Sequence, residues 1–276
     1  MKTMSTSMEK NTSIERVDEL MRQSDRIYEH IDTIVDGEPR HRRLTRFGIN
    51  AVAIALREGK SYSKASAEFL TLSADSKQKA GPLDFLGNQY ADVERATVDL
   101  QGNPETDSRH AIHLTYLSVP YAEEYYSELD SGKIAFYDLI HDLVEAEAKD
   151  VSSLGITKEQ AKIKHQNEMR AIKTLRQKYG KEWPGLIDAI ERYEALDEIE
   201  ARYTKTFDKL DPGFTHFSNK GLQLIERYNL TYDTFLQTIG QSTLRMATYS
   251  GEFPQLLRDR EELHRRVAEV TFKKAA

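Results

Sequence analysis

Apolar residues recur at three- and four-residue steps along most of the chain, the spacing that gives an α-helix one buried face. The first such segment covers residues 14–35, as one or two helices, and ends near Gly37 and Pro39, two residues that interrupt helices. Further helices are predicted at residues 47–56, 61–72, 107–129, 133–149, 158–179, 184–199, 200–210, 221–229, 232–249 and 254–272.

Alternation of apolar and polar residues, the pattern of a half-buried strand, is almost missing from the sequence. Only residues 93–100 could form one short strand. Helix starts are marked instead: Thr157 with Gln160 three residues later has the form of a capping box, and Pro184 suits the first turn of another helix. The sequence therefore predicts an all-α protein.

Residues 73–87, which contain Gly81-Pro82, have the composition of a connection between two parts of the chain. We predict an N-terminal helical extension over residues 1–80 and a main helical domain with additional C-terminal helices over residues 81–276. A chain of 276 residues is long enough to bury a sizeable core.

The charge of the chain limits its partners. The net charge is -6, so no stable nucleic-acid complex is expected, and an anionic substrate would need a metal ion or a few placed cations. A basic cluster at residues 40–43 with Arg46 is interpreted as a solvated helix start in preference to a phosphate site. No apolar run is long enough to span a membrane, and no signal peptide is visible, so we predict a cytoplasmic protein.

The chain has no cysteine, which excludes thiolate metal sites and cysteine nucleophiles. Metal ligands would have to be His, Asp or Glu. His141 and Asp142 stand side by side between apolar residues of the predicted helix 133–149, and burying both is costly unless a partner such as a divalent cation satisfies them. At 100° per residue, Glu145 returns to the face of this pair, whereas Glu147 points elsewhere.

Three parts of the sequence together resemble the HD-domain metal-dependent phosphohydrolases. His110 is followed about thirty residues later by the adjacent His141 and Asp142, and Asp208 lies on a late helix. Residues 140–151 resemble the second motif of that family with its downstream acids, and residues 200–211 resemble its last motif. The resemblance implies an HD-domain helical bundle in which His110, His141, Asp142 and Asp208 bind the metal.

The resemblance extends to the 5'-deoxynucleotidase branch, in which an Arg and a Glu stand fifteen and five residues before the first metal His. These offsets fall on Arg95 and Glu105, although Ala96 replaces the Trp that the branch carries next to the Arg. By this resemblance Glu145 and Asp142 are catalytic. The implied substrate-binding residues are Arg95, which would hold the phosphate, Asp150 near the sugar, Glu105, Lys149 and Lys209.

Two imidazoles and two carboxylates suit one divalent metal ion, whether Co, Mn, Ni, Zn, Fe or Mg. His113 competes with His110 for the role of ligand. His165 and Glu168 on the next helix could serve a second ion, but a solvated helix face is the preferred interpretation, and one metal is predicted.

The most economical function is hydrolysis of the 5'-phosphate of (deoxy)nucleoside monophosphates by a metal-activated water. Alternatives are release of triphosphate from a deoxynucleoside triphosphate, hydrolysis of a signalling nucleotide or phosphodiester, an iron-dependent oxidation, and a binding module with a vestigial site. The predicted partner is a small-molecule nucleotide. Apolar faces on the terminal helices also suggest a homo-oligomer, a dimer or larger.

Overall fold

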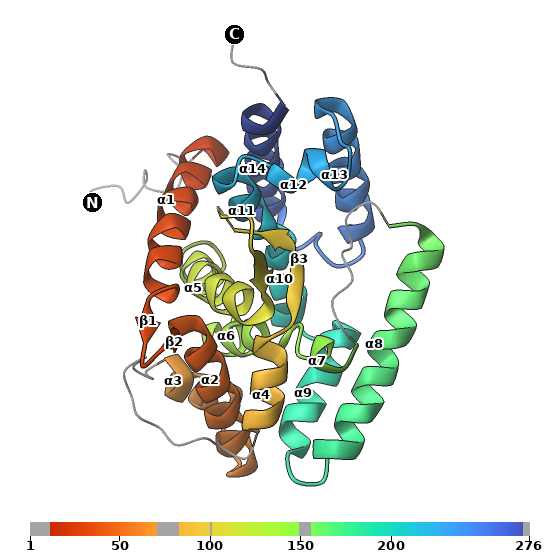
Figure 1. Cartoon of the computed structure of the whole chain (residues 1–276). Coiled ribbons are helices and arrows are strands. Elements are labelled where there is room, and N and C mark those ends of the chain that lie inside the picture. The colour runs from red at the N-terminus through yellow and green to blue at the C-terminus, as the bar shows by residue number, and fades with distance from the viewer. Residues whose placement is uncertain (1–11, 71–82, 100, 149–155, 273–276) are drawn as a thin grey trace, which may run out of the picture.

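The computed structural model describes residues 12–70, 83–99, 101–148 and 156–272, and it is all-α, as predicted (Figure 1). None of the helices in these ranges is long and apolar enough to cross a membrane. The helices are α1 (Ser13–Ile31), α2 (Arg40–Arg57), α3 (Tyr62–Leu70), α4 (Asp84–Ala91), α5 (Asp107–Tyr125), α6 (Ser131–Ile140), α7 (Glu145–Ala148), α8 (Lys158–Tyr179), α9 (Pro184–Ala195), α10 (Ile199–Asp208), α11 (Pro212–Ser218), α12 (Leu222–Glu226), α13 (Tyr232–Met246) and α14 (Pro254–Phe272).

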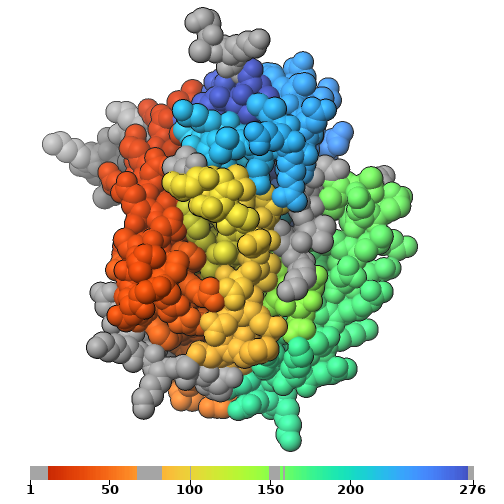
Figure 2. Space-filling model, viewed as in Figure 1, coloured from red at the N-terminus to blue at the C-terminus, as the bar shows by residue number. Residues whose placement is uncertain are grey.

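Two short antiparallel hairpins interrupt the helices. β1 (Ile34–Val35) pairs with β2 (Glu38–Pro39), so the predicted helix at residues 14–35 ends four residues early. β3 (Glu94–Val98) pairs with β4 (Pro104–Thr106), and β3 lies within the one segment predicted as a possible strand. In Figure 2 the β3–β4 segment lies between the N-terminal helices and α7–α8, below the C-terminal helices.

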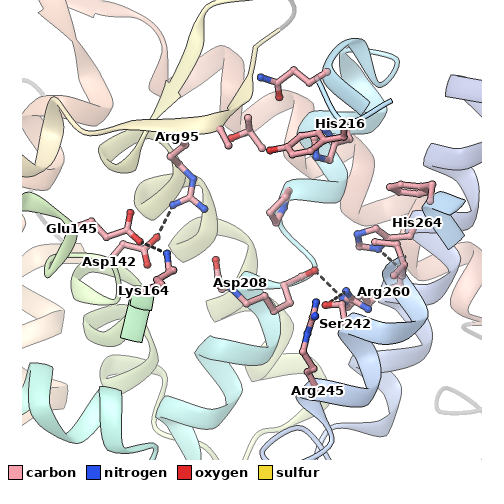
Figure 3. Close-up of a pocket in the computed structure, with 18 residues that line it drawn as sticks. Arg95, Asp142, Glu145, Lys164, Asp208, His216, Ser242, Arg245, Arg260 and His264 are labelled. Atoms are coloured by element: carbon pink, nitrogen blue, oxygen red, sulfur yellow. Dashed lines mark hydrogen bonds and ion pairs between the residues drawn. The ribbon is translucent and has the colours of Figure 1, made fainter. Parts of the chain in front are cut away.

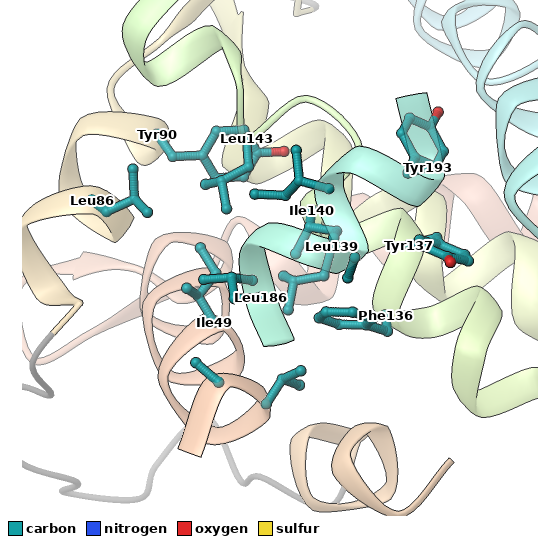
Figure 4. Close-up of a cluster of buried hydrophobic side chains, with 14 of the residues drawn as sticks. Ile49, Leu86, Tyr90, Phe136, Tyr137, Leu139, Ile140, Leu143, Leu186 and Tyr193 are labelled. Atoms are coloured by element: carbon teal, nitrogen blue, oxygen red, sulfur yellow. The ribbon is translucent and has the colours of Figure 1, made fainter. Parts of the chain in front are cut away.

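The core is built around α5 and α6, which pack against each other and against α2. Buried side chains of α6 and of the turn after it, including Phe136, Leu139 and Leu143, meet Ile49 of α2 and Leu186 of α9 (Figure 4). Helix α2 thus contributes to the same core as α6 and α9, while the predicted domain boundary after residue 80 stays a prediction.

The single helix predicted over residues 133–149 is wrong, because α6 ends at Ile140 and α7 begins only at Glu145. His141 Nδ1 lies 2.8 Å from Asp138 O, the carbonyl that would accept the Asp142 N–H in a continuing helix. Three-residue turns follow, with Glu145 N donating to Asp142 O at 2.8 Å. The imidazole therefore competes with the backbone and breaks the helix at the His-Asp pair.

The C-terminal helices close the upper part of the molecule in Figure 1. α13 and α14 pack on each other around Phe235 and Val267, and α14 also packs on α1. Buried Arg16 of α1 donates two hydrogen bonds of 2.8 Å to Asp259 of α14. The first and last described helices are thus held together by a buried, bidentate ion pair. The capping box predicted at Thr157 is confirmed at the start of α8.

Candidate active site

Four side chains from distant parts of the chain meet at one point. His110 comes from α5, His141 and Asp142 follow α6, and Asp208 is the last residue of α10. His110 Nε2 lies 3.2 Å from His141 Nε2 and 3.0 Å from Asp208 Oδ1, and His141 Nε2 lies 3.0 Å from Asp142 Oδ2. One donor atom from each residue lies within 4.8 Å of all the others. The structure therefore brings together the four residues implied by the resemblance.

The hydrogen-bond partners of the two imidazoles suit a pair of metal ligands. His110 Nδ1 lies 2.7 Å from Asp211 Oδ2, and His141 Nδ1 lies 2.8 Å from Asp138 O, so both Nδ1 atoms act as donors. In neutral rings the two Nε2 lone pairs then face each other with no hydrogen between them. A divalent cation would satisfy both nitrogens and the two carboxylates, and the nitrogen and oxygen donor set suits such an ion.

Electrostatics keep the two carboxylates of the cluster ionised. Burial alone would raise the pKa of Asp142, but His141 and Arg95 hold it well below its usual range. Burial likewise opposes ionisation of Asp208, and Lys209 with the two histidines lowers its pKa well below the usual range. Both side chains are therefore ionised at neutral pH, and a bound cation would replace the Nε2 protons of His110 and His141, whose pKa values the neighbouring carboxylates raise.

Arg95 of β3 lies beside the cluster. Its Nη1 donates to Asp142 Oδ2 at 2.6 Å and to Asp107 Oδ1 at 3.1 Å. Asp107, the first residue of α5 and fully buried, was not singled out in the sequence. Glu105 lines neither of the two cavities at the site. Its Oε2 accepts a hydrogen bond from the Thr97 hydroxyl at 2.6 Å and lies 3.9 Å from Arg95 Nε. Glu105 is therefore placed to position Arg95.

Glu145 begins α7, and its carboxylate lies next to the cluster. It is 3% exposed, and one of its oxygens lies within 4.8 Å of carboxylate oxygens of Asp142 and Asp107. Lys164 of α8 donates from Nζ to Glu145 Oε1 at 3.1 Å (Figure 3). Sequence reasoning missed Lys164, because no motif surrounds it and its contact depends on how α8 folds back over α7.

Of the other residues considered for the site in the sequence, one lies at the cluster and the others do not or are not described. Lys209 lines the cavities and donates to Asp208 Oδ2 at 2.6 Å. Lys149 and Asp150 lie outside the described residues. Glu147 lies 2.5 Å from Lys178 Nζ and is not part of the cluster, as expected, although the continuous helix on which that expectation rested is interrupted between Ile140 and Glu145.

The competing histidines have other environments. His113 Nδ1 lies 2.7 Å from Asp211 Oδ1 and its Nε2 lies 2.9 Å from Ser24 Oγ, so His113 is a buried, fully hydrogen-bonded side chain. His165 is exposed, and Glu168 lies 3.6 Å from Lys164 Nζ.

The arginines of the basic cluster at the start of α2 form ion pairs with neighbouring acids. Arg42 pairs with Asp92, Arg43 with Asp36 and Arg46 with Glu38, each at 2.6 Å.

Two adjoining cavities, of about 150 and 320 Å³, open on the cluster. Asp142, Glu145 and Lys209 line both of them. The smaller cavity continues among the C-terminal helices, where Phe235 lies in its wall together with His264, which is labelled in Figure 3. The larger one extends between α8 and α13. A small molecule could therefore reach the cluster from the side of the C-terminal helices.

Comparison with known proteins places the chain in a family. The model of the HD domain matches residues 88–247, more than half of the chain, so the chain belongs to the HD-domain family. A protein described as a predicted metal-dependent phosphohydrolase, from Magnetospirillum magnetotacticum, is similar in structure, with a sequence identity of 22% and a TM-score of 0.47. The alignment covers 66% of this chain and 91% of that protein. No curated protein matches the chain. Membership of the HD-domain family is thus confirmed, whereas the 5'-deoxynucleotidase branch stays a prediction.

Proposed function

We propose that this chain is a metal-dependent phosphohydrolase that acts on nucleotides, with one divalent cation held by His110, His141, Asp142 and Asp208. The observation that carries the proposal is the meeting of four ionised or lone-pair donor atoms within 4.8 Å at the wall of a cavity. Family membership supports it, since the His-Asp pair that gives the HD domain its name contributes two of these donors.

When bound, the cation would polarise a phosphoryl oxygen and lower the pKa of nearby water toward neutrality. The protein side chains supply the rest. Arg95 holds a phosphate oxygen with the N–H groups that do not donate to Asp107 or Asp142. The Glu145 carboxylate accepts a proton from the attacking water as the water oxygen bonds to phosphorus, and the ester oxygen leaves and takes up a proton from solvent. Lys164 fixes the position of that carboxylate, and Asp211 and the Asp138 carbonyl fix the two imidazoles.

A (deoxy)nucleoside 5'-monophosphate is the simplest substrate for this arrangement, because one phosphate would occupy the space beside Arg95. Its organic part would enter the smaller cavity, where Phe235 stacks on His264 with ring centroids 6.1 Å apart. A second candidate is the release of triphosphate from a deoxynucleoside triphosphate. It is favoured by the number of cationic side chains around the cavities, which include Lys164, Lys209 and Arg245.

The test is a product panel. The purified chain is incubated with nucleoside mono-, di- and triphosphates and with Co²⁺, Mn²⁺, Mg²⁺ or Zn²⁺, and phosphate, pyrophosphate and triphosphate are resolved. The proposal expects metal-dependent release of one of these products from at least one nucleotide. Absence of release from every nucleotide with every metal would reject it.

Replacement of Glu145 by Gln is expected to lower kcat by about 10²–10⁴-fold while the metal content is unchanged, because Gln keeps the shape of the side chain but cannot accept the proton. Steady-state kinetics and metal analysis of the same preparation measure both quantities. Glu147→Gln is the matched control, since Glu147 lies two residues away and pairs with Lys178. Equal rates for Glu145→Gln and the control would remove Glu145 from the mechanism.

A further inference from the structure

Arg260 of α14 is a buried cation whose hydrogen bonds all go to uncharged groups. Its side chain lines the smaller cavity, and the residue is only 2% exposed. Its guanidinium donates to Lys209 O at 2.9 Å, to Thr243 Oγ1 at 2.7 Å and to Ser242 Oγ at 3.0 Å. A guanidinium has five N–H groups, so two remain to bind a ligand.

The other two buried arginines of the described residues differ from Arg260 in this respect. Arg16 lies 2.8 Å from Asp259, and Arg43 lies 2.6 Å from Asp36. Burial lowers the pKa of Arg260 to about 10, although Tyr249 and exposed Glu261 act in the opposite direction, and Arg245 adds a smaller lowering effect. A buried charge without a counter-charge is costly, so the site is electrostatically incomplete without an anion.

Arg245 of α13 adds a second cation to the same wall. It lines both cavities, and its side chain makes no ion pair with another described residue. Ser242 lies one helical turn before Arg245, and since its oxygen accepts from Arg260, its own O–H is available as a donor. Three groups from α13 and α14 therefore offer donors toward the cavity (Figure 3).

This wall adjoins the proposed metal site through Lys209. The Lys209 carbonyl accepts from Arg260, while its Nζ donates to Asp208. An anion held by Arg260 and Arg245 would thus lie in the same cavity as a phosphate held by Arg95, on the other side of Asp208 in Figure 3.

We propose that Arg260, Arg245 and Ser242 form a second anion-binding subsite, which takes a further phosphate group of the substrate. The substrate class is then a nucleotide with two or more linked phosphates, so this subsite favours the second candidate of the proposed function over the monophosphate. This inference rests on the proposed function, because it assigns the scissile phosphate to the side of Arg95.

The test compares the binding of inorganic phosphate and inorganic tripolyphosphate to the full chain by calorimetry, with equal Mg²⁺ in cell and syringe and about 150 mM salt. The variants are Arg245→Gln and Arg260→Gln. Arg258→Gln is the matched control, because Arg258 is exposed on the same helix and does not line either cavity. We expect tripolyphosphate to bind at least about tenfold more tightly than phosphate, the effect of one charged hydrogen bond or more.

Each of the two cavity variants should weaken tripolyphosphate binding by about tenfold and change phosphate binding by less than about twofold, and Arg258→Gln should change neither. Equal affinities for the two anions in the unmodified chain, or equal losses in all three variants, would overturn the subsite. Arg245 is exposed, so Arg245→Gln carries the test even if Arg260→Gln fails to fold.

Binding is measured without turnover, which separates this inference from the proposed function. A chain that binds tripolyphosphate in the expected way but hydrolyses no nucleotide would keep the subsite and reject the proposed function. A chain that hydrolyses monophosphates and binds phosphate and tripolyphosphate equally would keep the proposed function and reject the subsite.

Discussion

Asp142→Ala is expected to abolish metal-dependent phosphate release, with kcat/KM reduced by at least about 10³-fold, because loss of one ligand removes both cation affinity and charge stabilisation of the transferred phosphoryl group. The structure gives two reasons for expecting the variant to fold. The Asp142 side chain is 21% exposed, and Arg95 keeps Asp107 as a partner at 3.1 Å.

The measurement is phosphate release together with metal content by elemental analysis, after circular dichroism has shown that the variant is folded. Glu147→Ala serves as the control, since it removes a carboxylate that pairs with Lys178 outside the cluster. A folded Asp142→Ala variant that keeps its activity would show that the cluster is not the reaction centre.

Asp211→Ala is expected to destabilise the protein by about 3–5 kcal/mol, the range for removing one partner of a buried charge interaction. Asp211 is fully buried, and its two oxygens accept from His110 Nδ1 and His113 Nδ1, both at 2.7 Å. Its removal leaves two buried N–H groups without acceptors. Because Asp211 also fixes the His110 tautomer, metal affinity should fall by about 10–100-fold.

Urea unfolding and metal titration measure these two effects. Asp188→Ala is a suitable control, because Asp188 makes a surface ion pair of 2.8 Å with Arg176, and such a pair contributes only about 0–1 kcal/mol. If Asp211→Ala unfolded at the same urea concentration as Asp188→Ala, the proposed support of the imidazoles by Asp211 would be wrong.

Helical spacing predicted the class of fold and most helices, because each amphipathic segment buries one face and the pattern is local. It failed at the His-Asp pair. The Asp138 carbonyl is bonded by the His141 side chain in place of a backbone N–H of the continuing helix, and residue spacing does not predict which of the two donors is used. The resemblance identified His110, His141, Asp142 and Asp208 as a set, and the structure brings the same four together.

The parts of the site that sequence reasoning missed depend on contacts between distant segments. Lys164 reaches Glu145 across the connection between α7 and α8. Arg260 meets the Lys209 carbonyl 51 residues away in sequence, and no periodicity or motif links the two. Charge and spacing on α14 would have assigned Arg260 to an ordinary helix face. Its burial without an acid, which only the packing shows, marks it as a candidate binding residue.

The most direct test of the central claim is metal removal and replacement. The chain is treated with a chelator, assayed with the nucleotide that gives the highest rate in the product panel, and titrated with Mn²⁺ while binding and phosphate release are followed together. We predict that the stripped chain is inactive and that activity returns in proportion to about one bound Mn²⁺ per chain, with neither binding nor recovery in a His110→Ala variant. Full activity in the stripped chain, or Mn²⁺ binding that is unchanged in His110→Ala, would contradict the account.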